Sequence, residues 1–169
     1  MSAINWGNIK SVDEFEKPCE LAVRGLDALL DYQNYPVKAA ESATMNRRPL
    51  GVGIINLAYW LAKNDITYQN PNLSLVDEYA EAWSFYLIKA SVELAKEKGA
   101  CLKSEDTKYA KGITPNMTYK KDLDELVDHE ERLPWDSLRS DLQIHGIRNS
   151  TLMALMPAET SAQISNATN

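Results

Sequence analysis

Residue types that commonly bind metals or act as nucleophiles are scarce in this sequence. Its 169 residues include two histidines, His129 and His145, and two cysteines, Cys19 and Cys101. The cysteines lie outside any Cys-x-x-Cys spacing, and Leu126 stands three residues before His129, where a di-metal carboxylate bundle needs Glu. No Gly-x-Ser-x-Gly motif and no Ser/His/Asp order occurs. We therefore expect two buried thiols, and no metal site, catalytic base or catalytic nucleophile.

Basic residues and long apolar runs are also few. The 18 Lys and Arg against 24 Asp and Glu give a net charge of −6 and a pI near 5.0, which argues against nucleic acid or an anionic membrane as the main partner. No apolar run approaches the roughly 20 residues of a membrane span, and the N-terminus has no signal-peptide pattern. We expect a cytoplasmic protein with one partial domain over residues 1–169.

The hydrophobic periodicity is mostly that of helices. A capping box at residues 11–14 predicts a helix start, and residues 74–98 have the clearest helical pattern, followed by Gly99. The core-facing positions expected in these two helices are Leu21, Ala22, Leu26, Leu29 and Leu30, and Val76, Tyr79, Trp83, Tyr86, Leu87, Ala90 and Leu94. Further expected elements are helices at 56–63, 123–132 and 137–145, and a short strand or an extended entry segment at 50–55. This order of helices and short buried strands indicates an α/β layer or barrel with too few strands to be complete.

Gly51 and Gly53 lie in the expected strand but do not form a dinucleotide-binding loop. Such a loop needs a third glycine, and Asn56 takes that place. Glycine in a strand also allows another segment to approach the backbone closely. We therefore expect close packing against Gly51 and Gly53.

The stretch of residues 150–165 combines the features of a strand, a tight turn and a helix start. Its apolar run, residues 152–156, favours a strand buried on both faces, and a proline ends the run. Residues 160–163 have the form of a capping box. A helix start has unpaired N–H groups and a partial positive charge, and it therefore attracts phosphate or carboxylate. Two interpretations stay open: the Thr160 and Ser161 hydroxyls bind an anion, or they cap their own helix and bind nothing.

The same part of the chain has a specific family likeness. The spacing of several residues marks the large (α) subunit of class I ribonucleotide reductase, namely Trp135, Leu138, Gly146, Ile147, Arg148, Asn149, Ala154 and Pro157. Collinear blocks at residues 21–33, 47–53, 108–112 and 119–124 extend the likeness over essentially the whole chain. The sequence therefore resembles that subunit.

The resemblance implies a helix-rich partial segment of that family's ten-stranded α/β barrel. It also implies a role in reducing ribonucleotides to deoxyribonucleotides for DNA synthesis, where a thiyl radical on a barrel cysteine abstracts the ribose 3′ hydrogen. The residues that match the family's substrate diphosphate turn are Pro157, Ala158, Glu159, Thr160 and Ser161. Thr160 and Ser161 would donate hydrogen bonds from side chains and backbone, and Glu159 would position the loop.

The family's catalytic groups have no counterpart in this sequence. The thiyl cysteine and both redox cysteines correspond to positions upstream of Met1, and the radical-relay tyrosines and the cysteine tail correspond to positions beyond Asn169. Neither Cys19 nor Cys101 matches a catalytic cysteine. We therefore expect no activity from this chain alone. The expected origin is a split gene, a gene interrupted by an intein or intron, or an excised segment.

The complete enzyme is expected to need other components. These are the remaining large-subunit fragments, a radical-generating di-metal small subunit, ATP or dNTP effectors, a thioredoxin or glutaredoxin reductant, and a ribonucleoside diphosphate substrate. This chain itself is expected to bind no cofactor. The other interpretation is a non-catalytic remnant, or a helical interaction module that keeps the fold. Intact Thr160 and Ser161 favour the enzyme component, because a remnant has no need of a phosphate turn.

Overall fold

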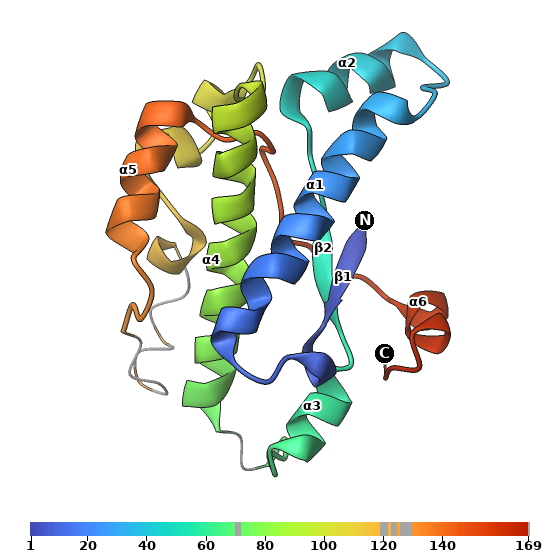
Figure 1. Cartoon of the computed structure of the whole chain (residues 1–169), viewed down its shortest axis with the longest axis vertical. Coiled ribbons are helices and arrows are strands. Elements are labelled where there is room, and N and C mark those ends of the chain that lie inside the picture. The colour runs from blue at the N-terminus through green and yellow to red at the C-terminus, as the bar shows by residue number, and fades with distance from the viewer. Residues whose placement is uncertain (70–71, 119–121, 123–124, 126–129, 169) are drawn as a thin grey trace.

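The computed structural model describes residues 1–169 except 70–71, 119–121, 123–124, 126–129 and 169, and helices dominate it (Figure 1). The strands and helices in chain order are β1 (Ser2–Asn5), α1 (Glu16–Tyr32), α2 (Lys38–Arg47), β2 (Val52–Ile55), α3 (Leu57–Lys63), α4 (Leu73–Lys98), α5 (Trp135–His145) and α6 (Glu159–Ile164). The helix-rich α/β class is confirmed. The predicted helix at 123–132 lies largely outside the described residues, and α2 was not predicted.

The two strands form a small parallel sheet. β1 pairs with β2 in a register that places Ser2 beside Val52 and Asn5 beside Ile55. On the other edge of β2, residues 151–154 run alongside and make backbone hydrogen bonds of 2.7 to 3.2 Å with Leu50 and Val52. The chain segment that leads to α6 is therefore attached directly to β2.

Residues 152–156 do not form the predicted strand with two buried faces. They make one β-bridge, between Met153 and Val52. Leu152 is buried, whereas Leu155 is 75% exposed. The hydrogen bonds to β2 end at Ala154, and the following proline has no N–H to continue a ladder. The prediction is therefore wrong beyond Ala154, where the chain turns away towards α6.

Helix α1 packs against α4 with a face different from the predicted one. Leu21 and Leu29 are 62% and 54% exposed, whereas Cys19, Val23 and Asp27 are buried. Residues four apart lie on one face of a helix, so these three form the inner stripe. The other predicted positions lie half-buried at the edge of the core: Ala22, Leu26 and Leu30. The stripe was misplaced because Asp27, a charged residue, occupies one of its central positions.

The chain enters α1 through a 3-10 turn at Val12–Phe15 rather than through the predicted capping box. The Ser11 side chain makes no capping bond, and the Glu14 carboxylate accepts a hydrogen bond from Lys10 N at 2.8 Å. The turn carries Phe15 into the core. There it joins an aromatic cluster with centroid distances of 4.7 to 5.8 Å, whose members are Trp6, Phe15, Trp60 and Tyr79. Burial of Phe15 accounts for the local geometry.

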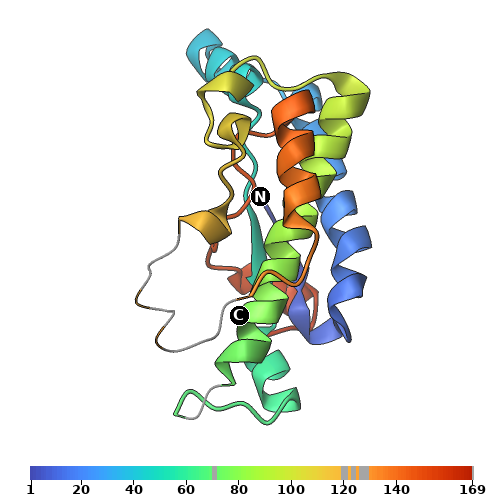
Figure 2. The same cartoon turned by 90° about the vertical axis from the view of Figure 1, so that its left-hand side faces the viewer.

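Helix α4 lies at the centre of the fold, with α1 and α5 packed against it (Figure 2). It begins after Asn72, whose side chain accepts from Leu75 N at 3.2 Å, so Ser74 is not its cap. It ends at Gly99, which has φ +85°. Its predicted core-facing residues all belong to the core or pack against it. No helix in the described part of the chain is long and apolar enough to cross a membrane.

A buried carboxylate attaches the start of α5 to α4. Glu81 accepts hydrogen bonds from Arg132 N at 2.8 Å, Leu133 N at 3.2 Å and Trp135 Nε1 at 2.8 Å.

The predicted helices at 56–63 and 137–145 are confirmed as α3 and α5. Gly146 follows α5 with φ +70°, as expected for a residue that ends a helix.

Candidate functional site

Helix α6 lies beside the sheet, on the side away from α4 and α5 (Figure 1). Its N-cap position is taken by Ala158, and no side chain makes a capping hydrogen bond. The capping box predicted at Thr160 is therefore wrong, and the helix begins at Glu159 instead. The physical reason is burial, because Ala158 and Ala162 are 6% and 3% exposed and attach one side of α6 to the fold.

The start of α6 has backbone N–H groups that make no hydrogen bond within the helix. Its first helical hydrogen bond runs from Ala162 N to Ala158 O at 2.7 Å. The N–H groups of Glu159, Thr160 and Ser161 therefore have no carbonyl acceptor within the helix. These three side chains are exposed, as is Pro157. The structure thus places the predicted site residues in one turn, in which Ala158 is buried and the other four are exposed. Two hydroxyls and three N–H groups of this turn can donate hydrogen bonds to an anionic group.

Gly53 determines how the chain reaches α6. A Cβ at Gly53 would lie 2.5 Å from Met156 Sδ and 2.6 Å from the carbonyl oxygen of Ala154. A Cβ at Gly51 would lie 3.2 Å from Ala154 Cβ. The predicted close packing against both glycines is confirmed. The segment before the turn lies directly on β2 and the residue before it because Gly53 and Gly51 have no side chains.

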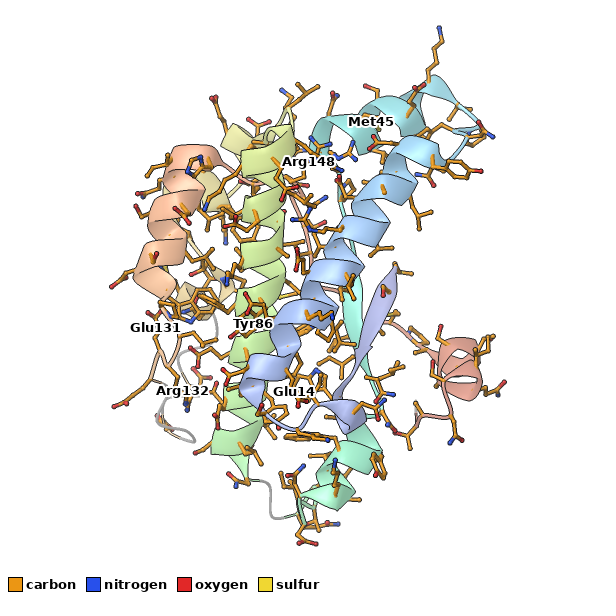
Figure 3. The ribbon with its side chains drawn as sticks, viewed as in Figure 1. Glu14, Met45, Tyr86, Glu131, Arg132 and Arg148 are labelled. Carbon is orange, nitrogen blue, oxygen red and sulfur yellow. The ribbon has the colours of Figure 1, made fainter. Side chains whose placement is uncertain are left out.

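Two adjacent residues of the family-like pattern converge on one buried carboxylate, that of Asp27. Asn149 Nδ2 donates to Asp27 Oδ1 at 3.0 Å, and Arg148 Nε lies 3.3 Å from Asp27 Oδ2. Figure 3 shows Arg148 between α4 and α1. Asn149 is also held by Ser91 of α4, whose hydroxyl donates to Asn149 Oδ1 at 2.9 Å. These bonds fix the chain just before residues 150–157.

Arg48 completes this buried network, a role that was not predicted from the sequence. It has left-handed backbone angles, φ +46° and ψ +51°, and is 3% exposed. Its Nε donates to Asp27 Oδ1 at 2.6 Å, and its two terminal nitrogens donate to the Asp31 carboxylate at 2.8 Å. Burial acts to raise the pKa of Asp27, but the hydrogen bonds from Arg48 and Asn149 outweigh it and hold that pKa below its usual value. The four-residue spacing of two aspartates in an amphipathic helix was the signal that could have revealed this site.

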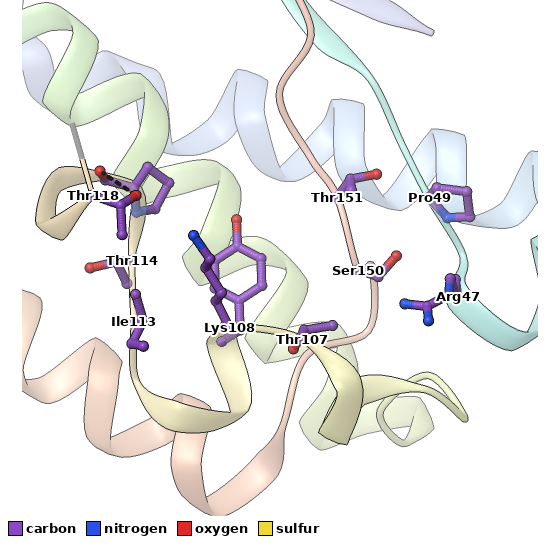
Figure 4. A pocket seen from close by; sticks show the side chains of 11 residues that line it. Arg47, Pro49, Thr107, Lys108, Ile113, Thr114, Thr118, Ser150 and Thr151 are labelled. Carbon is purple, nitrogen blue, oxygen red and sulfur yellow. Dashed lines mark hydrogen bonds between the residues drawn. The ribbon is translucent and has the colours of Figure 1, made fainter. Parts of the chain in front are cut away.

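Hollows lie at both ends of the strands of the sheet. One, of about 580 Å³, is lined by neutral polar residues at the carboxyl ends of β1 and β2 and by residues 165–168. The other, of about 420 Å³, lies near the start of β2 (Figure 4). Lys108 and Thr118 lie on one side of it, and Arg47 and Ser150 lie on the other. The carboxyl ends of parallel strands are the usual place for ligands in α/β folds, and α6 follows that end.

Both cysteines lie in surroundings that disfavour the thiolate form. Cys19 and Cys101 are buried and free. Burial raises the pKa of Cys19 to about 12 and also raises the pKa of Cys101, so neither is a ready thiolate. His145 is the last residue of α5, and His129 lies outside the described residues. Among the described residues, no group of three or more His, Cys, Asp or Glu is placed to hold a metal ion.

Comparison with known proteins gives one consistent family. Residues 2–169 match the family described as ribonucleotide reductase, barrel domain. The chain is 56% identical over 170 residues to the ribonucleoside-diphosphate reductase subunit alpha of Haemophilus influenzae, covering 100% of this chain and 22% of that protein. It is 56% identical over 141 residues to ribonucleoside-diphosphate reductase 1 subunit alpha of Salmonella typhimurium, covering 83% of this chain and 18% of that protein. The subunit alpha of Enterobacteria phage T4 is 48% identical over 157 residues, which are 93% of this chain and 21% of that protein.

The chain thus spans about a fifth of the length of these relatives, at most 22%. The family match covers nearly every residue of the chain, including the buried Asp27 network and the exposed turn of α6. The resemblance stated from the sequence is confirmed. The chain belongs to the ribonucleotide reductase family and represents part of its barrel domain.

Proposed function

We propose that this chain works as part of the large subunit of a ribonucleoside-diphosphate reductase, which makes deoxyribonucleotides for DNA replication. The observation that carries the proposal is the match of residues 2–169 to the reductase barrel domain, together with relatives that bear that enzyme's name. The chain contributes barrel elements and is inactive alone, because its two thiols are buried and match no catalytic cysteine.

The chain's own part in the reaction is to hold the substrate diphosphate at the turn Pro157–Ser161. The exposed hydroxyls of Thr160 and Ser161 and the three N–H groups at the start of α6 support this role. Their position at the carboxyl end of the strands supports it as well. Glu159 lies in the same turn with an exposed carboxylate, and it positions the loop rather than touching the phosphate.

The remaining components come from outside this chain. We infer that the rest of the large subunit supplies the thiyl and redox cysteines, and that a small subunit with a di-metal site generates the radical. ATP or dNTP effectors bind elsewhere on the large subunit, and thioredoxin or glutaredoxin provides the electrons. We place the assembly in the cytoplasm, where reduced thiols persist.

An intact-mass measurement after pull-down on this segment from its native source tests the proposal. A 19.0 kDa chain that co-purifies with flanking large-subunit fragments supports a reductase assembled from separate chains. The same peptides within one much larger polypeptide support the same function in an uninterrupted or spliced subunit. A 19.0 kDa chain that purifies with no reductase component contradicts the proposal and favours a non-catalytic remnant.

A further inference from the structure

Asn56 connects three separate parts of the chain at the carboxyl end of the sheet. Its Nδ2 donates to Asn5 Oδ1 at 2.9 Å, at the end of β1. Its Oδ1 accepts from Thr168 N at 2.9 Å and from Thr168 Oγ1 at 3.3 Å. Its backbone N–H donates to Thr168 O at 2.8 Å. The segment that leaves α6 is therefore bound to the end of β2 through both the backbone and the side chain of one residue.

The surroundings of Asn56 are built to accommodate its side chain. Asn56 is 6% exposed and has left-handed backbone angles, φ +66° and ψ +23°. Glycine adopts this conformation with less strain than asparagine. The backbone conformation alone therefore does not explain why asparagine occupies this position. Across from it, Gly7 leaves the space that the Asn56 amide fills, because a Cβ at Gly7 would overlap Asn56 Nδ2 and lie 2.6 Å from Tyr59 Cδ1. The side-chain amide, and not the backbone conformation, is therefore the reason for an asparagine at this position.

Helix α6 depends on contacts with β2 at both of its ends. It has six residues, which is too short to be stable by itself. The chain enters it over Gly53, where Ala154 and Met156 lie on the strand, and leaves it through Thr168, bound to Asn56. Both attachment points belong to one short stretch of backbone. The attachments at Gly53 and Asn56 therefore determine the direction in which the start of α6 points.

We propose that Asn56 is a positioning residue for the diphosphate turn. By binding Thr168 it holds α6 in the orientation that presents the N–H groups and hydroxyls of Thr160 and Ser161 to the substrate. Asn56 does not contact the substrate itself. The inference rests on the proposed function, since it assigns a supporting residue to that turn. It predicts that loss of the amide weakens substrate binding more than it slows the chemical step.

The test uses the complete large subunit that contains this segment, with Asn56→Gly as the variant. Glycine keeps the left-handed backbone and removes only the side-chain bonds. The matched control is Asp65→Gly, at an exposed turn residue with φ +55° outside the site. We expect Asn56→Gly to raise the KM for a ribonucleoside diphosphate about tenfold with kcat within about twofold, because small displacements of binding groups have large effects. Asp65→Gly should change neither constant.

Amide hydrogen exchange on the same proteins gives a second measurement. In Asn56→Gly, amides of residues 158–168 should exchange faster, while those of α4 should exchange as in the wild type. An unchanged KM in Asn56→Gly, alongside a raised KM in Thr160→Ala/Ser161→Ala, overturns the positioning role and leaves the proposed function intact. An unchanged KM in both variants overturns both. A fall in kcat with KM unchanged also contradicts the positioning role.

Discussion

Arg48 and Asp27 form an ion pair in which both side chains are almost fully withdrawn from solvent, with Nε 2.6 Å from Oδ1. The pair joins α1 to the end of α2, and Asn149 binds the same Asp27 oxygen from the segment that leads to α6. One carboxylate thus connects three segments that are distant in sequence. Removing one partner of such a pair leaves an uncompensated buried charge, which makes the network sensitive to substitution.

Asp27→Asn should therefore destabilise the protein strongly. Asparagine has a similar shape but no charge, so it leaves Arg48 with only the half-exposed Asp31 as a counter-ion. We expect the free energy of unfolding, measured by urea titration, to fall by about 3 kcal/mol. Asp31→Asn is the matched control and should cost about 1 kcal/mol or less, since that carboxylate is 49% exposed. Equal losses in the two variants would contradict a special role for the buried pair.

The same network predicts how stability depends on pH. Asp27 and Asp31 both have pKa values below the usual 3.8 in the folded state. Burial acts to raise the pKa of Asp27, but the hydrogen bonds from Arg48 and Asn149 lower it by more. The hydrogen bonds from Arg48 lower the pKa of Asp31. A lowered folded-state pKa contributes stability that is fully present above the unfolded value and is lost as the pH falls through the folded value. Unfolding free energy should therefore decline below about pH 4. The Asp27→Asn variant should show a shallower acid dependence, and an unchanged slope would exclude Asp27 as its source.

Gly53→Ala should displace the segment that leads to α6. The added methyl group would overlap Met156 and the backbone carbonyl of Ala154, which cannot move independently of the chain. We expect a loss of about 1 to 3 kcal/mol in unfolding free energy and faster hydrogen exchange in α6. Gly25→Ala is the control, because nothing lies within 4 Å of a Cβ at that position in α1. There alanine should stabilise the helix by about 0.5 to 1 kcal/mol, so the two substitutions should have opposite signs.

Neither cysteine should react with thiol reagents while the protein is folded. Cys19 has a pKa of about 12 and Cys101 a raised pKa, both through burial. A colorimetric thiol titration should find little reaction in native buffer and both thiols in denaturant. Rapid labelling of Cys19 under native conditions would contradict its buried position and reopen a redox role for it.

The sequence predicted the elements whose patterns are local. The α4 stripe, the helix end at Gly146 and the close approach at Gly53 follow from the spacing of apolar residues and from what glycine allows. Patterns that depend on distant partners were misread. The buried position of Arg48 was not predicted, because its partner, Asp27, is far away in sequence. The same pairing places a charged residue on the inner face of α1, and the predicted stripe was therefore on the wrong face.

The helix start near residues 157–161 was predicted correctly from the sequence, but its first residue was not, and its role in substrate binding stays a prediction. Residues 157–161 do form an exposed helix start, yet the helix begins at Glu159 because buried alanines, not hydroxyls, fix its first turn. Residues 160–163, which have the capping pattern, therefore already lie inside the helix. Asn56 was noted only as the residue that replaces a glycine. Its link to Thr168 could not be predicted, because the two residues meet only through the folded sheet.

The most direct test of the central claim is the KM of the complete reductase for a ribonucleoside diphosphate when Thr160 and Ser161 are both changed to Ala. Each charge-assisted hydrogen bond that is lost should weaken diphosphate binding about tenfold, so we predict a KM raised at least tenfold. Ser165→Ala, a hydroxyl loss at the other end of α6, should leave KM unchanged. An unaltered KM in the double variant would contradict the account, because it would remove these side chains from the substrate site.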